Sequence, residues 1–225
     1  MARLARIVLP QVPHHVTQRG NRQMTVFSQA GDYALYRDLL AGRLKTYAVV
    51  CSAYCLMPNH VHLLLTPTQA DASEAATALS RAVGETHRRF TSFVNARART
   101  TGHLFQGRFG SAAMDEAHWL NAVRYLAFNP VRAGLAERPQ DWPWSSVRAH
   151  LAGRDDALVQ VAPLLAVAPR FDTLLQPGPD DPHWAEVSAH GRPMGDAAFL
   201  ARAEAVLERS LAPARRGRKP TKSGT

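Results

Sequence analysis

The sequence predicts an α+β fold, in which an antiparallel sheet carries helices packed on one face and is followed by a C-terminal helical extension. Two observations support this prediction. Short, strongly apolar segments typical of strands take turns with longer segments whose apolar residues recur at helical spacing. In chain order these segments give strand, helix, strand, strand, helix, strand, and then one further helix. A β-α-β-β-α-β order predicts a ferredoxin-like sheet.

The first half of this pattern starts with a strand expected over residues 14–19, which the turn signal Gly20-Asn21 ends. Residues 32–45 then place leucine and tyrosine side chains at helical spacing and predict a helix. Residues 47–57 (YAVVCSAYCLM) are largely apolar, so we expect them to form a strand in the centre of the sheet.

The second half of the pattern contains four elements: a strand from His60, a helix over 71–96, a strand over 108–114 and a helix over 116–128. The strand from His60 follows the previous strand across a tight turn, which predicts a hairpin. Asp71 with Glu74 three residues later resembles the capped start of a helix. Asn129-Pro130 is expected to end the last helix, because the residue before a proline avoids the helical region.

The chain is expected to divide into a domain over residues 1–150, a helical extension over 151–211 and a basic tail over 212–225. Within the extension, QPGPDDP (176–182) is typical of a loop or linker. Residues 196–211 carry an amphipathic pattern and predict the main helix of this part.

The tail carries four basic residues that are expected to bind DNA: Arg215, Arg216, Arg218 and Lys219. Arg216-Gly217-Arg218 resembles an AT-hook core, which puts arginines into a narrow minor groove, although Lys219 interrupts the usual Arg-Gly-Arg-Pro order. The alternative, which we favour slightly, is a non-specific phosphate binder whose affinity falls with salt.

The composition favours a nucleic-acid partner. The chain has 225 residues, a formal net charge of +9 and a pI of about 10.4. A basic balance suits a polyanion, either nucleic acid or an anionic membrane. No segment resembles a signal peptide or a membrane-spanning run. We therefore expect a cytoplasmic protein that binds nucleic acid and no membrane.

The centre of the chain carries a His-x-His pair, His60 and His62, directly after the turn signal Pro58-Asn59. Residues i and i+2 of a strand share one face, so both imidazoles point the same way. Two such imidazoles can hold one divalent cation. A structural pair is the commoner interpretation of this pattern alone, but its position at the start of a strand favours a site that ligands can reach.

Four other side chains are weaker candidate ligands. Cys51 and Cys55 would lie roughly 13 Å apart along their strand, at about 3.3 Å per residue, so one zinc ion cannot bind both and buried thiols are the better interpretation. His14 and His15 would point to opposite faces of the first strand, so at most one of them could approach a metal or DNA. A structural role is favoured for both histidines.

The last predicted helix places Tyr125 four residues before Asn129, so the two side chains share one face. The Asn129 side-chain carbonyl can bind a hard cation. Tyrosine is a poor nucleophile near neutral pH because its pKa is about 10, but a cation bound to the scissile phosphate would withdraw charge from phosphorus. Attack by Tyr125 would then give a covalent phosphotyrosine bond. The alternative is that Tyr125 packs in the core and Asn129 caps the helix.

Four motifs, in this order, resemble the single-tyrosine HUH transposase family, and most closely the REP-associated tyrosine transposases of bacteria: PNHVH, HLFQGRF, RYLAFNPVRAGL and DWPWSS. The opening HHVTQRGN is also similar to the family's start, and the resemblance spans about residues 3–150. It implies that His60 and His62 bind Mg²⁺ or Mn²⁺, with Asn129 as the third ligand. It also implies a ferredoxin-like fold, Tyr125 as the nucleophile, and cleavage of single-stranded DNA at a hairpin-flanked site.

The resemblance further implies a bacterial, nucleoid-associated protein that acts as a monomer or a homodimer. Gln106, Arg108 and Arg132 fall in the resembling segments and are candidates for DNA contacts, with a structural role as the alternative. Trp142 and Trp144 could stack on unpaired bases, but we favour a clamp that holds the chain to the core. Four more arginines, late in the second helix, could bind phosphates or form a solvated face: Arg88, Arg89, Arg97 and Arg99.

The resulting hypothesis is a metal-dependent enzyme that nicks and rejoins single-stranded or hairpin DNA and leaves a 5′-phosphotyrosine and a 3′-hydroxyl. One rival is a DNA-binding regulator that keeps the fold without cutting, and the intact candidate residues count against it. A second rival is an RNA-binding module, since similar sheets bind single strands by stacking. The predicted strands lack an obvious pair of exposed aromatic residues for that role.

Overall fold

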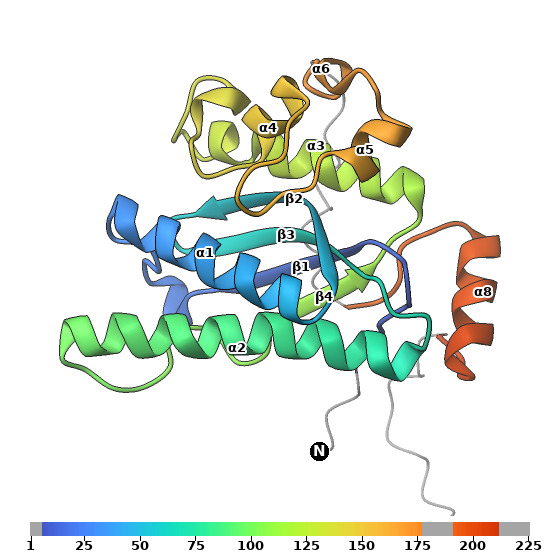
Figure 1. Ribbon diagram of the computed structural model, residues 1–225, viewed down its shortest axis with the longest axis horizontal. Helices are drawn as coiled ribbons and strands as arrows, with labels where there is room; N and C mark the ends of the chain where they lie inside the picture. Colours follow the sequence, from blue (N-terminus) through green and yellow to red (C-terminus); the bar gives the residue numbers. More distant parts are fainter. Residues whose placement is uncertain (1–5, 177–190, 212–225) are drawn as a thin grey trace, which may run out of the picture.

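The computed structural model describes residues 6–176 and 191–211. Its centre is a four-stranded sheet made of β1 (His14–Arg19), β2 (Val49–Met57), β3 (His60–Pro67) and β4 (Gly110–Ala113). The strands lie in the order β2-β3-β1-β4, and every neighbouring pair is antiparallel (Figure 1). This order and direction confirm the predicted ferredoxin-like sheet.

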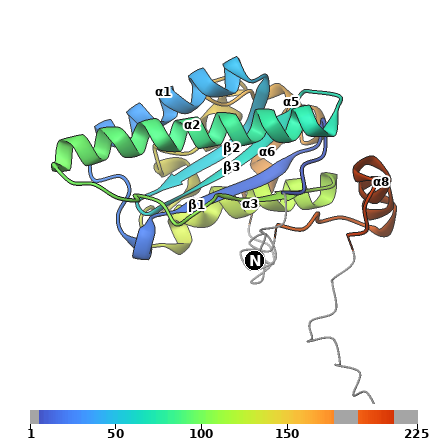
Figure 2. The same cartoon turned by 90° about the horizontal axis from the view of Figure 1, so that it is seen from below.

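Helices cover both faces of the sheet (Figure 2). On one face lie the two helices of the β-α-β-β-α-β pattern, as predicted: α1 (Ala30–Thr46) and α2 (Ala72–Ala98). On the other face lie the additional helix and three short ones: α3 (Glu116–Arg132), α4 (Val147–Ala152), α5 (Ala162–Val167) and α6 (Phe171–Leu174). Each face has its own apolar core, because the side chains of a strand alternate between the two faces.

The alternation along β3 determines where its polar residues point. Leu63 and Leu65 are fully buried in the core beneath α1 and α2. Leu64 belongs instead to the core beneath α3. His60 and His62 share the face of Leu64, since they are separated from it by even numbers of residues. Both histidines therefore face α3.

Strand β2 lies at the edge of the sheet, so the predicted central position is wrong. The segment after α3 runs along its outer side. The N–H of Leu56 donates to the carbonyl of Trp144 at 2.9 Å, and the N–H of Ser146 donates to the carbonyl of Tyr54 at 3.0 Å. These bonds occupy backbone groups that an edge strand would otherwise expose. The covering segment explains why an edge strand has the apolar sequence of a central one.

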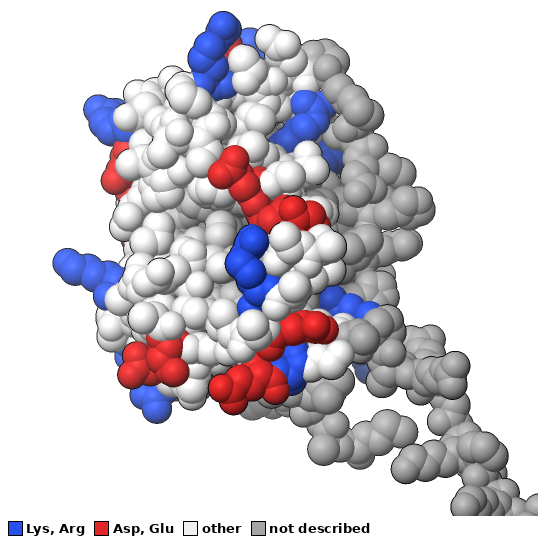
Figure 3. All heavy atoms as spheres, turned by 90° about the vertical axis from the view of Figure 1, so that its right-hand side faces the viewer, with Lys and Arg blue, Asp and Glu red and all other residues white. Residues whose placement is uncertain are grey.

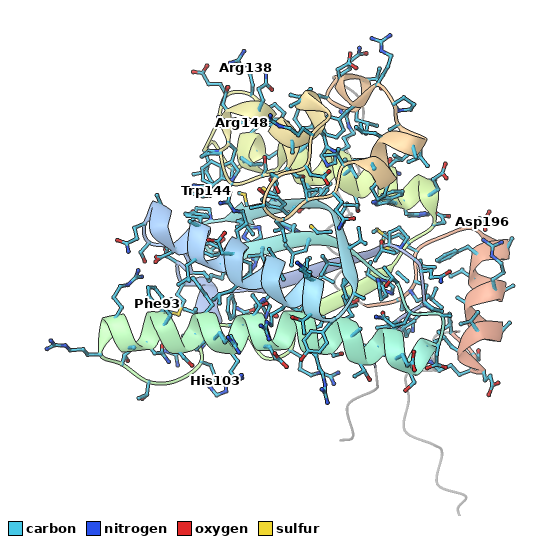
Figure 4. The ribbon with its side chains drawn as sticks, viewed as in Figure 1. Phe93, His103, Arg138, Trp144, Arg148 and Asp196 are labelled. Carbon is cyan, nitrogen blue, oxygen red and sulfur yellow. The ribbon has the colours of Figure 1, made fainter. Side chains whose placement is uncertain are left out.

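Two tryptophans hold this covering segment to the core, which confirms the predicted clamp. Trp144 lies beside α1 (Figure 4) and stacks on Tyr33, with ring centroids 4.7 Å apart and planes 10° apart. The indole N–H of Trp142 donates to the carbonyl of Leu56 at 3.0 Å. Both rings are thus engaged by the protein itself.

Helix α3 continues to Arg132 and does not end before Pro130, so the predicted helix end is wrong. Pro130 is buried in the last part of the helix, where its missing N–H removes one donor. The following turn is kept by the N–H of Ala133, which donates to the carbonyl of Asn129 at 3.0 Å. Asn129 is therefore helical, and it stays on the face that carries Tyr125.

Helix α2 begins as predicted, with the Asp71 carboxylate accepting a hydrogen bond from the N–H of Glu74 at 2.9 Å. Near its other end, Arg97 forms an ion pair with Asp32 of α1, whose side chain is fully buried. This ion pair joins the two helices on one face of the sheet, so Arg97 has a structural role.

Replacing Arg97 by alanine is expected to lower the free energy of unfolding by about 2 kcal/mol, because the buried Asp32 carboxylate loses its charged partner. The Arg97 side chain is 35% exposed, so solvent screening keeps the loss below that of a fully buried pair. Urea unfolding measures the change. Arg88→Ala, an exposed site on the same helix, is the control and should change stability by less than about 0.5 kcal/mol. Equal losses in both variants would contradict a stabilising ion pair.

His87 on α2 is buried beside Phe105 and Tyr36, with a 2.9 Å hydrogen bond between its Nε2 and the Tyr36 hydroxyl. Burial lowers its pKa from 6.5 to about 3, and the charge of Arg6 adds to the effect. The unfolded chain therefore binds a proton below about pH 6.5 that the folded chain does not bind. Stability from this group is complete above that pH and is lost as the pH falls toward the folded pKa.

Between about pH 7 and about pH 5, His87 is expected to remove about 2 kcal/mol of stability. The loss over this interval should accordingly be about 2 kcal/mol smaller in His87→Phe, which keeps an aromatic ring at the position. Urea unfolding of both proteins at the two pH values measures the difference. The pH dependence, and not the absolute stability, is the readout, because the variant also loses the bond to Tyr36. An unchanged pH dependence would contradict the prediction.

The C-terminal helix α8 (Ala197–Leu207) begins where the sequence predicts and ends before the expected residue 211. The Asp196 carboxylate caps it by accepting from the N–H of Phe199 at 2.7 Å. Phe199 packs with Leu9 and Ala113 in a small third core. The N–H of Asp196 donates to the carboxylate of Asp115 at 3.0 Å, which ties the start of α8 (Figure 4) to the start of α3.

Residues 177–182 of the predicted linker and the whole basic tail, residues 212–225, lie outside the described residues. The division of the chain into a domain, an extension and a tail stays a prediction. Across residues 6–176 and 191–211, no helix combines the length and the apolar character needed to cross a membrane.

Candidate active site

The His-x-His pair lies at the start of β3. Its two rings are 4.9 Å apart between centroids and nearly perpendicular, at 85°. The His60 Nδ1 lies 2.6 Å from the side-chain oxygen of Asn59. An oxygen acceptor requires a proton on Nδ1, which leaves the lone pair of His60 on Nε2. Burial lowers the pKa of His60 to about 4, with a contribution from Arg19, so the ring is neutral near pH 7.

His62 is contacted by a third histidine, His15 of β1. The His62 Nδ1 and the His15 Nε2 are 2.9 Å apart, and the two rings stack at 14° with centroids 5.1 Å apart. The Nε2 of His62 is buried and has no hydrogen-bond partner among the described residues. Burial lowers the pKa of His62 well below 6.5, and the neighbouring histidines and arginines add to the effect. His62 is thus a neutral imidazole. Its Nδ1 contacts His15, and its Nε2 has no hydrogen-bond partner among the described residues.

Helix α3 brings Tyr125 to these histidines. The Tyr125 ring lies 5.4 Å from the His62 ring and 6.4 Å from the His15 ring, edge-on to both. Asn129 follows one turn later on the same helix face. Its amide nitrogen is buried without a hydrogen-bond partner in the described part of the chain. The fold therefore brings together Tyr125 with both predicted histidine ligands, and Asn129 lies one turn away from Tyr125.

Two arginines put positive charge around Tyr125. The Arg132 guanidinium lies over the Tyr125 ring, 4.7 Å from its centroid, and donates to the Tyr125 carbonyl at 3.0 Å. Arg19, at the end of β1, pairs in register with His60. Burial raises the pKa of Tyr125, whereas the charges of Arg132 and Arg19 act in the opposite direction. Positive charge at this place favours both a phenolate and a bound phosphate.

The residues present fit a divalent metal. His60 and His62 are neutral imidazoles, the form that binds a metal, and each has its Nδ1 engaged by a neighbour. The buried, unpartnered Nε2 of His62 is the atom a metal would satisfy. Within the described residues there is no cluster of three or more histidine, cysteine or acidic residues with metal-binding geometry. A metal at His60 and His62 would therefore need Asn129, water or the substrate for its remaining positions.

Comparison with known proteins identifies the family. Residues 9–129 match the model of the family described as "Transposase IS200 like", and this range contains both histidines, Tyr125 and Asn129. The chain belongs to the IS200-like transposase family. A protein of Haemophilus influenzae named as a REP-associated tyrosine transposase is 30% identical over 118 residues, which cover 49% of this chain and 66% of that relative. The match thus spans slightly less than two thirds of the relative's length.

A solved structure described as a REP-associated tyrosine transposase bound to a REP hairpin has the same fold. It superposes with a TM-score of 0.57 at 20% sequence identity, over 72% of this chain and 93% of that chain. Membership of the IS200-like family and this shared fold agree with the resemblance that the sequence motifs indicate.

The two cysteines of this IS200-like chain are not predicted ligands, although Cys55 lies opposite His62 in the register of β2 and β3 and so borders the site. Cys51 and Cys55 are both free and buried, as expected from the sequence. They belong to different cores, on opposite faces of the sheet, because β2 has an irregularity between Cys51 and Ala53 that changes the alternation. His14 is also structural, since its Nε2 accepts from the N–H of Leu9 at 3.1 Å and its Nδ1 lies 2.7 Å from the carbonyl of Val12.

The other predicted DNA-binding residues are more dispersed. The N–H of Gln106 donates to the carbonyl of Arg19 at 2.9 Å, so the exposed Gln106 side chain lies near the end of β1. Arg108 is exposed and lies near Arg6, whose guanidinium donates to Ser80 of α2 at 3.1 Å. The tail residues that are predicted to bind DNA lie outside the described residues: Arg215, Arg216, Arg218 and Lys219.

The distribution of charged side chains does not indicate a DNA-binding surface at the end of the molecule that carries α8. Acidic and basic side chains alternate on this end, and the described residues form no continuous basic patch there (Figure 3). The positive charge relevant to the site is local, from Arg19 and Arg132.

Two site residues were missed by reasoning from the sequence, His15 as a partner of His62 and Arg19 as a charge beside Tyr125. The sequence shows that His15 and Arg19 share one face of β1, but it does not show that β1 pairs with β3. The available signal was the opening HHVTQRGN, which contains both residues and resembles the start of the family.

Proposed function

We propose that this protein is a metal-dependent endonuclease and strand transferase that nicks and rejoins single-stranded hairpin or palindromic DNA through a covalent 5′-phosphotyrosine. The observation that carries the proposal is the approach of Tyr125 to His62, with ring centroids 5.4 Å apart. Tyrosine, both histidines and Asn129 come from one chain, so the proposal requires no second copy in the site. Membership of the IS200-like transposase family supports the same chemistry.

Tyr125 would act as the nucleophile. Its phenol oxygen forms a bond to the scissile phosphorus while the bond between phosphorus and the 3′-oxygen breaks. The phenol proton leaves to solvent and the departing oxygen takes up a proton, which gives a 3′-hydroxyl and a 5′-phosphotyrosine. One phosphate ester replaces another, so attack by a 3′-hydroxyl in the reverse direction rejoins a strand without ATP.

The surrounding residues would prepare this step. Mg²⁺ or Mn²⁺ held by His60, His62 and Asn129 would polarise the scissile phosphate and neutralise charge that develops on it. Arg132 and Arg19 would favour the phenolate of Tyr125, whose pKa burial raises. Both guanidiniums would also attract the phosphate itself.

The DNA partner is proposed from the relatives and from charge. The solved relative is described as bound to a REP hairpin. For this chain we propose a single-stranded DNA hairpin in a bacterial cell, acted on by a monomer or a homodimer. Gln106 lies near Arg19 and would contact DNA beside the site, together with Arg132 and Arg108. The basic tail would add phosphate contacts whose strength falls with salt.

A cleavage assay tests the proposal. The full chain is incubated with end-labelled single-stranded DNA hairpins, with Mn²⁺ or with a chelator. We expect a shortened DNA strand and a protein–DNA adduct that survives denaturation, both only with the metal. Random single strands of the same length control for non-specific nuclease activity. Binding of several hairpins without any cleavage would contradict the proposal and favour a non-cleaving DNA-binding regulator.

A further inference from the structure

The strand β1 places a third imidazole behind the His-x-His pair. His15 is 1% exposed, and its ring is enclosed between β3, β4 and α3. It lies opposite Ala112 of β4, whose small buried side chain leaves room for a ring. On its other side, His15 is the diagonal neighbour of His62, since His15 pairs with Leu64 in the register of β1 and β3.

The contact between the two rings couples the positions of their protons, because each arrangement fixes the proton of both imidazoles. A hydrogen bond between two neutral imidazoles needs one N–H and one lone pair. If His15 donated, the proton of neutral His62 would have to sit on Nε2, where it would block a metal. If His62 donates from Nδ1, its Nε2 carries a lone pair instead. Only the second arrangement leaves His62 able to bind a metal.

We propose that His15 is a positioning residue that accepts the Nδ1 proton of His62 and thereby holds the His62 Nε2 lone pair toward the metal. His60 has a comparable partner in Asn59, at 2.6 Å. The two ligands thus differ in the partner that orients them: a neighbour in sequence for His60, and a residue from the adjacent strand for His62. Outer partners of this kind typically change metal affinity about 10- to 100-fold.

This inference rests on the proposed function, because it assumes that His60 and His62 bind the metal. The test measures Mn²⁺ binding directly, without DNA or turnover. The electron paramagnetic resonance signal of free Mn²⁺ is followed as the full chain is titrated, and the dissociation constant is compared among four proteins: the wild type, His15→Phe, His15→Gln and His14→Gln.

Phenylalanine keeps a ring at position 15 but has no acceptor, so we expect His15→Phe to weaken Mn²⁺ binding about 10- to 100-fold. Glutamine can place an amide oxygen near the position of the imidazole Nε2, so His15→Gln should bind Mn²⁺ within about threefold of the wild type. His14 is a buried histidine of the same strand on the opposite face, bonded to Leu9 and Val12. His14→Gln therefore controls for damage to β1 and should bind Mn²⁺ like the wild type.

The outcomes separate the inference from the proposed function. If the wild type binds Mn²⁺ and both His15 variants bind it equally well, the positioning role is wrong and the metal site stands. If His15→Gln binds Mn²⁺ as weakly as His15→Phe does, an acceptor at position 15 does not restore the affinity, and the inference also fails. If the wild type itself does not bind Mn²⁺, both the inference and the metal dependence of the proposed function are wrong. Circular dichroism of each variant verifies that the fold is retained.

Discussion

Tyr125→Phe is expected to abolish formation of the protein–DNA adduct and to lower the rate of hairpin cleavage by at least about 1,000-fold. The reason is that the variant loses the one oxygen that would form the bond to phosphorus. The ring itself is retained, so its contacts with His62, His15 and the Arg132 guanidinium remain possible. Single-turnover cleavage of a labelled hairpin with Mn²⁺ measures the rate, and denaturing electrophoresis measures the adduct.

Tyr47→Phe is the matched control for this experiment. Tyr47 follows α1 on the opposite side of the sheet, where its hydroxyl donates to Glu85 of α2. Removing that hydroxyl should leave both the adduct and the cleavage rate unchanged. An adduct that persists in Tyr125→Phe would show that another residue is the nucleophile.

His62→Ala is expected to have the second largest effect, on metal binding and on cleavage together. It removes a direct ligand, so the loss of Mn²⁺ affinity should exceed the 10- to 100-fold that is typical when only an outer partner is changed, and roughly 1,000-fold is expected. Cleavage at a fixed, low Mn²⁺ concentration should fall in parallel. Mn²⁺ is expected to raise the midpoint of thermal unfolding of the wild type, because a ligand of the folded state stabilises it, and this rise should be absent in His62→Ala.

The control for His62→Ala is another buried histidine outside the site. His150 of α4 stacks on Phe171 with ring centroids 4.7 Å apart. His150→Phe keeps that stack and should retain Mn²⁺-dependent cleavage and the thermal shift. A full thermal shift in His62→Ala would contradict the assignment of His62 as a ligand, even if cleavage were lost.

Local periodicity predicts the two pairs of site residues, but it does not predict that the two pairs lie close together in the fold. The two-residue repeat of a strand predicts that His60 and His62 share a face, and the four-residue spacing on a helix predicts the same for Tyr125 and Asn129. Neither rule says that α3 covers the face of β3 that carries the histidines. That arrangement depends on the packing of a third layer against the sheet, and the resemblance to a known family was the signal that joined the two halves.

Two predictions about the fold are wrong, and the partner of His15 was not predicted. Local rules place a helix end before Pro130 and a strand as apolar as β2 in the centre of a sheet. In the structure the helix continues to Arg132, and β2 is an edge strand covered by the segment that contains Trp144. The contact of His15 with His62 could not be predicted, because it is set by the register between β1 and β3. The position of β2 and the partner of His15 are decided by contacts between segments that lie far apart in the chain, whereas the turn after Pro130 is kept by the local bond from Ala133 to Asn129.

The most direct test of the central claim is to identify the amino acid that carries the DNA. The wild-type adduct, formed with Mn²⁺ on a single-stranded hairpin, is digested with protease and nuclease and analysed by mass spectrometry. We expect one peptide that carries a nucleotide 5′-phosphate on the phenol oxygen of Tyr125. A nucleotide attached to any other residue, or cleavage that leaves no covalent adduct at any time during the reaction, would contradict a 5′-phosphotyrosine mechanism at this site.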